Sequence, residues 1–286
     1  MMKSILAALD GSAESLAGLE QAVAWAERLD ADLRALFVQD ERHFVTYPTY
    51  TDSEGTVPKP IPLSGKAKER AEAEAAREES ELYSAYERAI KGRSVRGEFR
   101  VVRGLVEHTL VREAHAADLV VLGKRGRGLD ESVEGAGPTT ETMIHEALRP
   151  VLVVPKGGIT SGPMLVPFDG SHGVQRVIVP AVELASALDV SVTVLTLAER
   201  RSDGEALQAP LRAYLKSHGI TGDFRVVEGH DTERGAARLI LGAAQELQAG
   251  LIAMGAFSVG PLREFFVGSV TREVLTHAPC PVLIVR

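Results

Sequence analysis

The chain repeats itself, and this repeat limits the folds that it can adopt. Three stretches of the first half recur in the second half in the same order. The matched stretches are Ala7–Ser12 with Leu165–Ser171, Glu98–Gly104 with Asp223–Gly229, and Arg149–Val154 with Cys280–Val285. Three landmarks in one order are difficult to obtain by chance, so the sequence predicts a tandem duplication of one structural unit.

Each copy alternates short apolar runs with helical segments. In the first copy we predict strands at Ile5–Leu9, Leu33–Val38, Phe99–Val102, Leu119–Leu122 and Val151–Val154. Continuous apolar strands between helices are typical of a parallel sheet that is covered on both faces. A length of 286 residues suits two such domains. We place them at residues 1–156 and 163–286, with a glycine-rich linker between.

Residues 43–65 interrupt this alternation. They include four prolines, which cannot continue a helix or a central strand. We interpret the stretch as a long loop, either a mobile lid or, as we favour, a disordered insertion. A charged helix is predicted next, over residues 66–91, with Leu82, Tyr83, Tyr86 and Ile90 facing inward and the charges solvated.

Composition argues against several classes of protein. The net charge is −7 with no basic stripe, which disfavours nucleic acid as a partner. No apolar run approaches the roughly 18 residues of a membrane span, and the first apolar segment is too short for a signal peptide. The single cysteine, Cys280, cannot form an internal disulfide and is expected in the core. The cytoplasm is therefore the expected location.

One loop in the second copy has the features of an anion site. The apolar run Leu251–Gly255 ends in a turn, and the following loop closes on Gly268 and Ser269 at the start of a helical segment. Backbone N–H groups and the positive end of a helix favour a phosphate. Glycine at such a place lets the backbone approach the phosphate oxygens.

Polar residues follow the strands that should be neighbours. Asp10 and Gly123 follow the first and fourth predicted strands, and Asp169 and Gly255 follow their counterparts. Ligands of open parallel sheets bind beyond these carboxyl ends, where the strand order reverses. Each aspartate can accept hydrogen bonds from a ribose or cap the next helix, and one residue can do both.

These features resemble the universal stress protein family. The resemblance rests on strand-Asp-Gly-Ser in each copy, the fourth-strand glycine followed later by Gly-Ser-x-Thr, and the terminal strand after Pro150 or Pro281. It covers nearly the whole chain except residues 43–65. It implies an α/β fold of two tandem domains, each a five-stranded parallel sheet in the order 3-2-1-4-5 with helices on both faces. It also implies pairing of the domains through their last strands, residues 151–154 and 282–285.

The nucleotide-binding branch of this family carries Gly-x-x-Gly, nine residues, then Gly-Ser or Gly-Thr. The second copy matches this spacing, although Ser258 replaces the second glycine. The resemblance implies that Asp169 holds the ribose and that Leu197 meets the adenine through its backbone. The implied phosphate contacts are Gly255, Ser258, Gly268 and Ser269. Arg263 is either an additional phosphate contact or a solvated surface residue.

The first copy matches the same motif less well. Gly123 and Gly126 satisfy Gly-x-x-Gly, and Asp10 and Val38 take the places that contact ribose and adenine. Pro138 replaces the final Ser or Thr, and proline has no N–H to donate. The first copy is therefore either a degenerate structural domain or a second working site.

The resemblance implies a stress-response regulatory protein that binds ATP or a related adenine nucleotide, mainly in the second copy. Any Mg²⁺ would arrive with the nucleotide, and hydrolysis would be slow or absent. The sequence has no phosphate-loop Gly-Lys-Ser or Gly-Lys-Thr, and we assign no catalytic residue and no metal site. Two alternatives remain, a nucleotide-free signalling scaffold and an enzyme of the nucleotide α-hydrolase type. The sequence leaves open whether two chains form a homodimer.

Overall fold

The first half of the chain supplies five strands of the main sheet and four helices. The computed structural model describes residues 2–47, 59–128, 135–158, 161–229, 233–256 and 268–286. The first-half strands are β1 (Ser4–Leu9), β2 (Asp32–Asp40), β5 (Gly97–Gly104), β6 (Leu119–Gly123) and β7 (Val151–Val154). The helices are α1 (Ala13–Leu29), α2 (Gly65–Ile90), α3 (Val106–Ala114) and α4 (Pro138–Glu146).

The second half repeats this order of elements. Its strands are β8 (Met164–Pro167), β9 (Val192–Ala198), β10 (Gly222–Glu228), β11 (Leu251–Gly255) and β12 (Val282–Val285). Its helices are α5 (His172–Leu188), α6 (Arg201–Ser217), α7 (Glu233–Glu246) and α8 (Ser269–His277). The repeat extends to single residues, because α1 and α5 both end on an aspartate with a positive φ, Asp30 at 48° and Asp189 at 50°.

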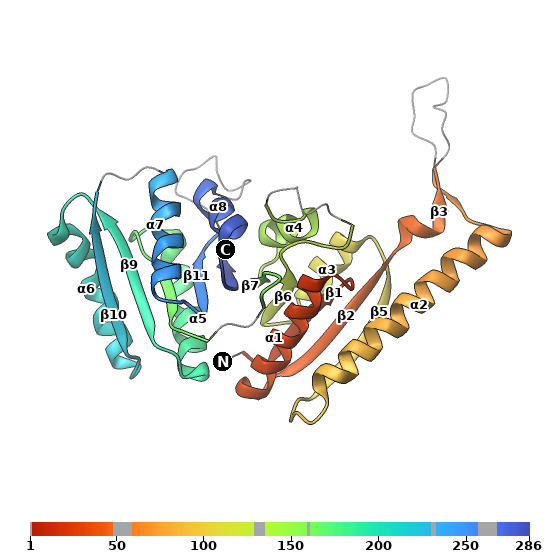
Figure 1. The fold of residues 1–286 in the computed structure, drawn as a ribbon, viewed down its shortest axis with the longest axis horizontal. Helices are drawn as coiled ribbons and strands as arrows, with labels where there is room; N and C mark the ends of the chain where they lie inside the picture. Colours follow the sequence, from red (N-terminus) through yellow and green to blue (C-terminus); the bar gives the residue numbers. More distant parts are fainter. Residues whose placement is uncertain (1, 48–58, 129–134, 159–160, 230–232, 257–267) are drawn as a thin grey trace, which may run out of the picture.

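All ten strands join one sheet in the order β10-β9-β8-β11-β12-β7-β6-β1-β2-β5. Within each half the order is 3-2-1-4-5 and the pairing is parallel, which confirms the predicted fold. The last strands β7 and β12 pair antiparallel in the middle of the molecule, with Leu152 opposite Leu283 (Figure 1). The first strands β1 and β8 each lie beside a fourth strand, β6 or β11, so each half has one point where strand order reverses.

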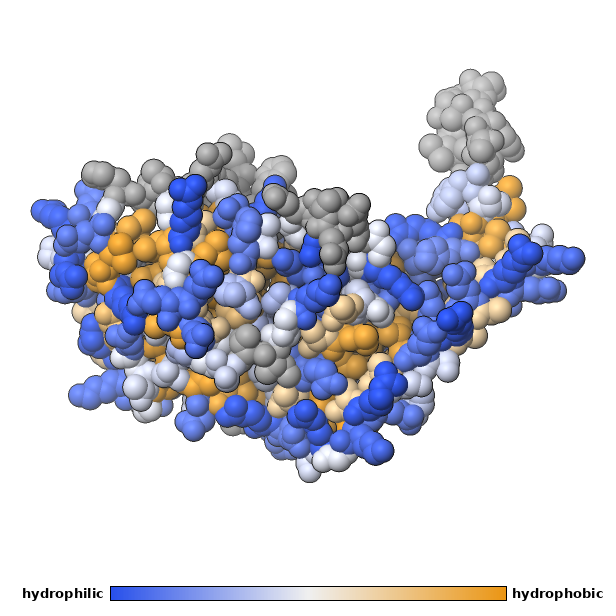
Figure 2. All heavy atoms as spheres, viewed as in Figure 1, coloured by the Kyte–Doolittle hydropathy of each residue, from blue (hydrophilic) through white to orange (hydrophobic). Residues whose placement is uncertain are grey.

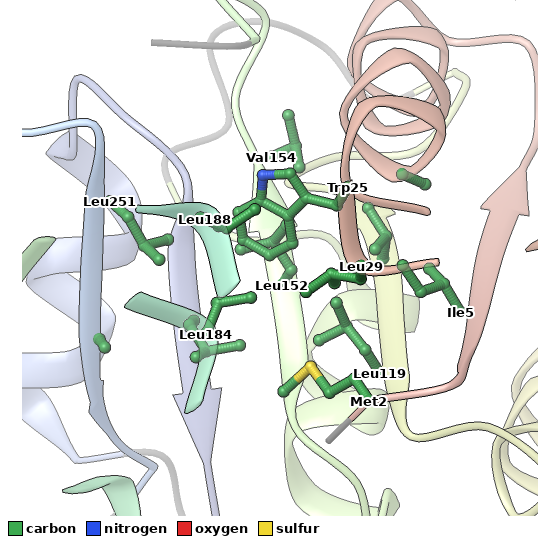
Figure 3. Close-up of a cluster of buried hydrophobic side chains, with 14 of the residues drawn as sticks. Met2, Ile5, Trp25, Leu29, Leu119, Leu152, Val154, Leu184, Leu188 and Leu251 are labelled. Atoms are coloured by element: carbon green, nitrogen blue, oxygen red, sulfur yellow. The ribbon is translucent and has the colours of Figure 1, made fainter. Parts of the chain in front are cut away.

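Two apolar cores cover the two faces of the sheet. One contains residues of α1, α2, α5 and α6, and the other contains residues of α3, α4, α7 and α8. Each core runs through both halves. Trp25 of α1 belongs to the same buried cluster as Leu184 and Leu188 of α5 and Leu152 of β7 (Figure 3). The two halves therefore share buried apolar surface at the centre of the molecule.

The stretch predicted as an irregular loop, residues 43–65, carries regular structure at its described ends. A 3₁₀ helix (Glu41–Phe44) precedes strand β3 (Val45–Thr46), which pairs antiparallel with β4 (Ile61–Pro62). Residues 48–58 lie outside the described residues. The prolines restrict the choice of structure but still permit a two-residue ribbon, since Pro62 can sit on an edge strand.

Helix α2 follows this insertion and presents a hydrophilic outer edge (Figure 2). Its buried residues are Ala75, Leu82, Tyr86 and Ala89. The prediction of an inward Tyr83 was wrong, since 46% of this residue is exposed. The Tyr83 ring nevertheless meets the Phe99 ring of β5 in an edge-to-face arrangement, with the ring centroids 5.6 Å apart.

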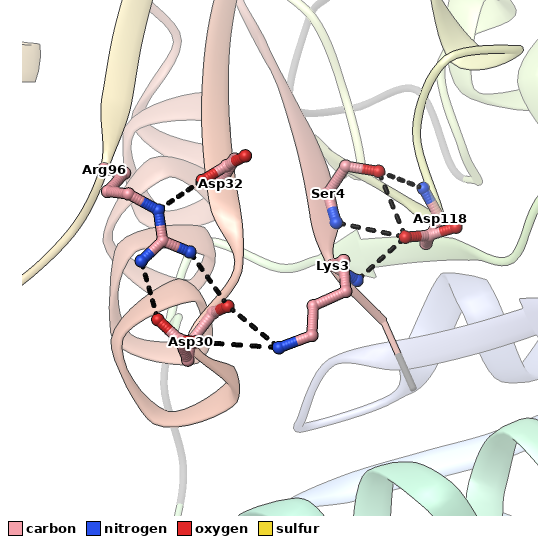
Figure 4. A network of polar contacts seen from close by, with 6 residues as sticks. All are labelled: Lys3, Ser4, Asp30, Asp32, Arg96 and Asp118. Carbon is pink, nitrogen blue, oxygen red and sulfur yellow. Dashed lines mark hydrogen bonds and ion pairs between the residues drawn. The ribbon is translucent and has the colours of Figure 1, made fainter.

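Polar contacts fasten the start of β1 to its neighbours (Figure 4). Asp118 Oδ2 accepts hydrogen bonds from the backbone N–H groups of Lys3 (2.8 Å) and Ser4 (3.1 Å) and from the Ser4 hydroxyl (3.1 Å). Burial opposes the charged form of Asp118, but these hydrogen bonds outweigh it and hold the pKa of the carboxyl below its usual range. At a neighbouring corner, Arg96 bridges Asp30 and Asp32.

Candidate functional site

The turns after β1 and β8 have the same hydrogen-bonding pattern. Asp10 Oδ1 accepts from the backbone N–H of Ser12 (2.9 Å), and Asp169 Oδ1 accepts from the backbone N–H of Ser171 (2.9 Å). The serines, not the aspartates, are the N-caps of α1 and α5. The capping alternative for the aspartates is therefore wrong. Each carboxylate accepts the hydrogen bond of its turn through Oδ1, and Oδ2 takes no part in that bond.

The two aspartates differ in the hydrogen bonding of their second carboxylate oxygen, Oδ2. Asp10 Oδ2 accepts a 2.6 Å hydrogen bond from the backbone N–H of Arg127. Asp169 is exposed, and its Oδ2 makes no hydrogen bond within the described part of the chain. A ligand hydroxyl would compete with a backbone N–H for Asp10. The described surroundings of Asp169 impose no such competition.

The glycines at the ends of β6 and β11 occupy equivalent places. The Thr140 hydroxyl donates to the Gly123 carbonyl and the Thr271 hydroxyl donates to the Gly255 carbonyl, both at 3.0 Å. The backbone N–H of Gly137 donates to the Lys124 carbonyl (2.9 Å), as that of Gly268 does to the Ala256 carbonyl (3.1 Å). Gly137 and Gly268 are then the matching N-caps of α4 and α8, and Pro138 corresponds to Ser269.

Packing, rather than phosphate binding, already accounts for one of these glycines. A Cβ at Gly123 would lie 2.7 Å from the backbone nitrogen of Ser15, which is closer than real Cβ atoms approach other atoms. A Cβ at Gly255 would have its nearest neighbour at 3.4 Å, the carbonyl oxygen of Gly173. The first turn of α1 thus packs tightly on β6, whereas the first turn of α5 leaves more space over β11.

The structure brings the four first-half site residues together. Asp10, Val38, Gly123 and Gly126 all line one cavity of about 100 Å³. Ligand sites for small molecules usually measure roughly 300–1,000 Å³. The predicted cluster is therefore assembled, but the space beside it is small for a nucleotide.

The three cations of the first-half loop contact other parts of the protein. Lys124 Nζ donates to the Thr276 carbonyl at the end of α8 (2.9 Å), and burial with the nearby Arg125 charge lowers the pKa of Lys124. Arg127 Nη1 pairs with Glu78 of α2 at 2.6 Å. Arg125 Nη2 lies 3.5 Å from Glu14 Oε1. A phosphate in this half would have to compete for each of these cations.

The second-half residues lie where the motif placed them, as far as the structure describes them. Leu197 is half-buried near the end of β9, opposite Val227 of β10. Gly255 ends β11, Gly268 is the N-cap of α8, and Ser269 is the exposed first residue of that helix. Ser258 and Arg263 lie outside the described residues. Because α8 starts at this edge of the sheet, the positive end of its dipole faces the site.

Sequence reasoning missed Glu14. This residue is 6% exposed, and its Oε2 accepts a 2.6 Å hydrogen bond from the backbone N–H of Arg125. Aligning the two copies from Asp-Gly-Ser onward places Gly173 opposite Glu14, and this difference was the signal that could have found it. Among the described residues, no three or more His, Cys, Asp or Glu side chains are arranged to hold a metal ion.

Comparison with known proteins agrees with the duplicated fold. The profile of the Universal stress protein family matches twice, at residues 1–155 and 161–286. The chain belongs to the universal stress protein family. Within the family, it is 26% identical over 171 residues to the universal stress protein Slr1230 of Synechocystis sp., an alignment that covers 59% of this chain and 58% of that protein. The match thus spans less than two thirds of the length of that protein.

Solved structures extend the likeness of the fold to the full chain. A universal stress protein from Archaeoglobus fulgidus aligns with a TM-score of 0.73 and 16% identity, covering 99% of this chain and 98% of its own. A functionally unknown protein from Pseudomonas aeruginosa aligns with a TM-score of 0.61 and 17% identity, covering 99% and 92%. The described helices include none with the length and apolar character that a membrane span requires.

Proposed function

We propose that this universal stress protein is a stress-response regulator that binds ATP or a related adenine nucleotide, mainly in its second half, with slow or no hydrolysis. Asp169, Gly255 and the start of α8 support the proposal because they meet where the strand order of the second half reverses. In this arrangement Asp169 accepts from the ribose hydroxyls, and the backbone at the end of β9, near Leu197, meets the adenine. The first turn of α8 faces the phosphates.

The observation that carries this assignment is the contrast between Asp169 and Asp10. Both carboxylates hold the same turn through Oδ1, but Asp10 also holds the backbone of Arg127 through Oδ2. Asp169 is the exposed member of the pair. A carboxylate whose second oxygen has no hydrogen-bond partner among the described residues, as at Asp169, can bind a vicinal diol without breaking a hydrogen bond described there. Any Mg²⁺ would arrive with the nucleotide.

We further infer that residues 1–156 and 163–286 are the two domain units. The antiparallel pairing of β7 with β12 supports an intramolecular arrangement in which the last strands hold the units together. This arrangement places the end of α8 beside the first-half loop, where Lys124 contacts Thr276. The binding half and the other half are thus in physical contact.

The proposal is tested by copying the first-half proline into the second half. Ser269→Pro removes one N–H at the first position of α8, where proline is tolerated. We expect ATP affinity to fall by roughly tenfold to 100-fold, the value of a hydrogen bond to a charged group. Gly268→Val, which places a branched side chain between backbone and phosphate, should abolish binding. Isothermal titration with ATP and Mg²⁺ measures both effects.

Pro138→Ser is the matched control, because it restores the N–H at the equivalent position of the first half. It should leave wild-type affinity and stoichiometry unchanged, since Glu14 and Asp10 still accept hydrogen bonds from the backbone N–H groups of the first-half turn. A wild-type chain that binds no adenine nucleotide would contradict the proposed function, and so would unchanged affinity in both Ser269→Pro and Gly268→Val. Timing the release of ADP or AMP from the complex separates slow hydrolysis from an α-hydrolase activity.

A further inference from the structure

The Gly-x-x-Gly turn of the first half is held by two carboxylates of its own chain. Glu14 Oε2 accepts from the backbone N–H of Arg125, and Asp10 Oδ2 accepts from the backbone N–H of Arg127, each at 2.6 Å. These two N–H groups belong to the turn that the motif assigns to phosphate. Carboxylate and phosphate oxygens are the same kind of acceptor for a backbone N–H. Both N–H groups therefore already have an anionic partner.

The position of Glu14 in the fold stabilises its hydrogen bond to the Arg125 backbone. It belongs to the first turn of α1, where a negative charge interacts favourably with the helix dipole. It is 6% exposed, and Arg125 Nη2 lies 3.5 Å from its Oε1. A phosphate that displaced Glu14 from the turn would deprive a buried carboxylate of its short hydrogen bond to the Arg125 backbone, which is unfavourable. Entry of a phosphate is thus opposed by the cost of releasing Glu14.

In the second half, the helix position that corresponds to Glu14 is Gly173, which brings no side chain to this place. Gly123 packs against the backbone of Glu14 and Ser15, and Gly255 packs against the backbone of Gly173 and Val174. The matched contacts show that Gly173 is the structural counterpart of Glu14. Because glycine has no side chain, Gly173 in the first turn of α5 cannot place a side-chain hydrogen-bond acceptor near the turn after β11. The two copies therefore differ at one helix position, which carries a carboxylate in the first half and no side chain in the second.

We propose that Glu14 is an internal ligand that occupies the phosphate position of the first half, so that Glu14 and Gly173 determine which half binds nucleotide. The proposal rests on the proposed function in one respect, namely that the turn after the fourth strand of each half is a phosphate site. Asp10 assists by holding the other end of the same turn. The protein thereby keeps one copy of the site closed without any change in the fold.

The test removes the internal ligand and counts sites by isothermal titration with ATP and Mg²⁺. Glu14→Ala in the wild-type background should raise stoichiometry from about one to about two nucleotides per chain. Combined with Ser269→Pro, it should give binding that is at least about tenfold tighter than Ser269→Pro alone, since the gain arises in the first half. Glu14→Gln keeps the shape and an acceptor but lacks the charge, so its gain should be smaller.

Gly173→Glu is the reciprocal variant and should weaken binding in the second half. Emission of the only tryptophan, Trp25, which packs within the core between α1 and α5, reports whether each variant is folded. Folded Glu14→Ala variants that bind no more ATP than their parents would overturn the proposal, even if the wild-type chain binds one nucleotide. If the wild-type chain binds none, the proposed function fails, whereas new binding by Glu14→Ala would still support the internal ligand.

Discussion

At the scale of single residues, two glycines that look identical in the sequence have different physical roles. Gly123 is required by packing, because a Cβ would lie 2.7 Å from the Ser15 nitrogen and 2.8 Å from the Glu14 carbonyl carbon. Backbone atoms of a helix cannot move aside as a flexible side chain can. At Gly255 the nearest contact of a Cβ would be 3.4 Å, a distance that a shift of a few tenths of an ångström relieves.

We therefore expect Gly123→Ala to lower the free energy of unfolding by about 2–3 kcal/mol through overpacking, and Gly255→Ala by less than about 1 kcal/mol. Urea unfolding followed by far-UV circular dichroism measures both variants, with Gly255→Ala as the matched control. Equal losses for the two variants would show that the approach of α1 to β6 does not set the requirement for glycine.

At the scale of secondary-structure elements, Asp118 connects the start of β6 to the start of β1. Its carboxylate accepts from two backbone N–H groups and one hydroxyl, and its pKa lies below the usual value. A lowered pKa contributes stability that is present above the unfolded-state pKa, near 3.9, and is lost as the pH falls toward the folded-state value. The contribution should therefore be complete at pH 7.

Asp118→Asn removes the charge but keeps the size of the side chain. We expect a loss of about 1–2 kcal/mol in the free energy of unfolding at pH 7, modest because the site is only half-buried. The difference from wild type should shrink as the pH falls below about 4, because the wild-type carboxyl then becomes neutral. Chemical unfolding of both proteins at several pH values measures this difference in the free energy of unfolding. A difference that stays constant down to pH 3 would contradict the electrostatic explanation.

The same scale shows what the sequence could predict. Strand order followed from the resemblance carried by Asp-Gly-Ser and the later glycines, and the apolar runs located the five main-sheet strands of the first copy to within two residues, whereas β3 and β4 were missed. The aspartates were placed at the correct strand ends. The sequence could not show that Asp10 Oδ2 accepts a hydrogen bond from the Arg127 backbone, because that contact joins residues 117 positions apart.

Glu14 was missed because its contact with Arg125 is also long-range, and because a glutamate in the first turn of a helix is common and does not by itself indicate a special role. Tyr83 was placed inward because helical periodicity groups it with Tyr86 and Ile90, but in the structure Leu82, Tyr86 and Ala89 form the buried face of α2 and Tyr83 is exposed.

At the scale of the whole molecule, the two halves share their cores. Each core cluster contains residues from both halves, and β7 pairs with β12 across the centre. Polar contacts add to this connection, because Arg286 donates to the His145 carbonyl and Arg28 donates to the Leu188 carbonyl. Separating the halves would expose apolar surface on both, so we expect them to unfold together despite the length of the chain.

This expectation can be tested with a second-half core variant and a first-half probe. Leu195→Ala in β9, where the side chain is 4% exposed, should cost about 2–4 kcal/mol through the cavity that it creates. If the halves unfold as one unit, Trp25 fluorescence and circular dichroism should shift to lower urea concentration by the same amount. Leu207→Ala, on the same half but 41% exposed, is the control and should shift neither probe appreciably. Independent halves would instead give a biphasic dichroism curve for Leu195→Ala. Trp25 emission would then also change in two steps, because its surroundings include α5 of the second half as well as α1.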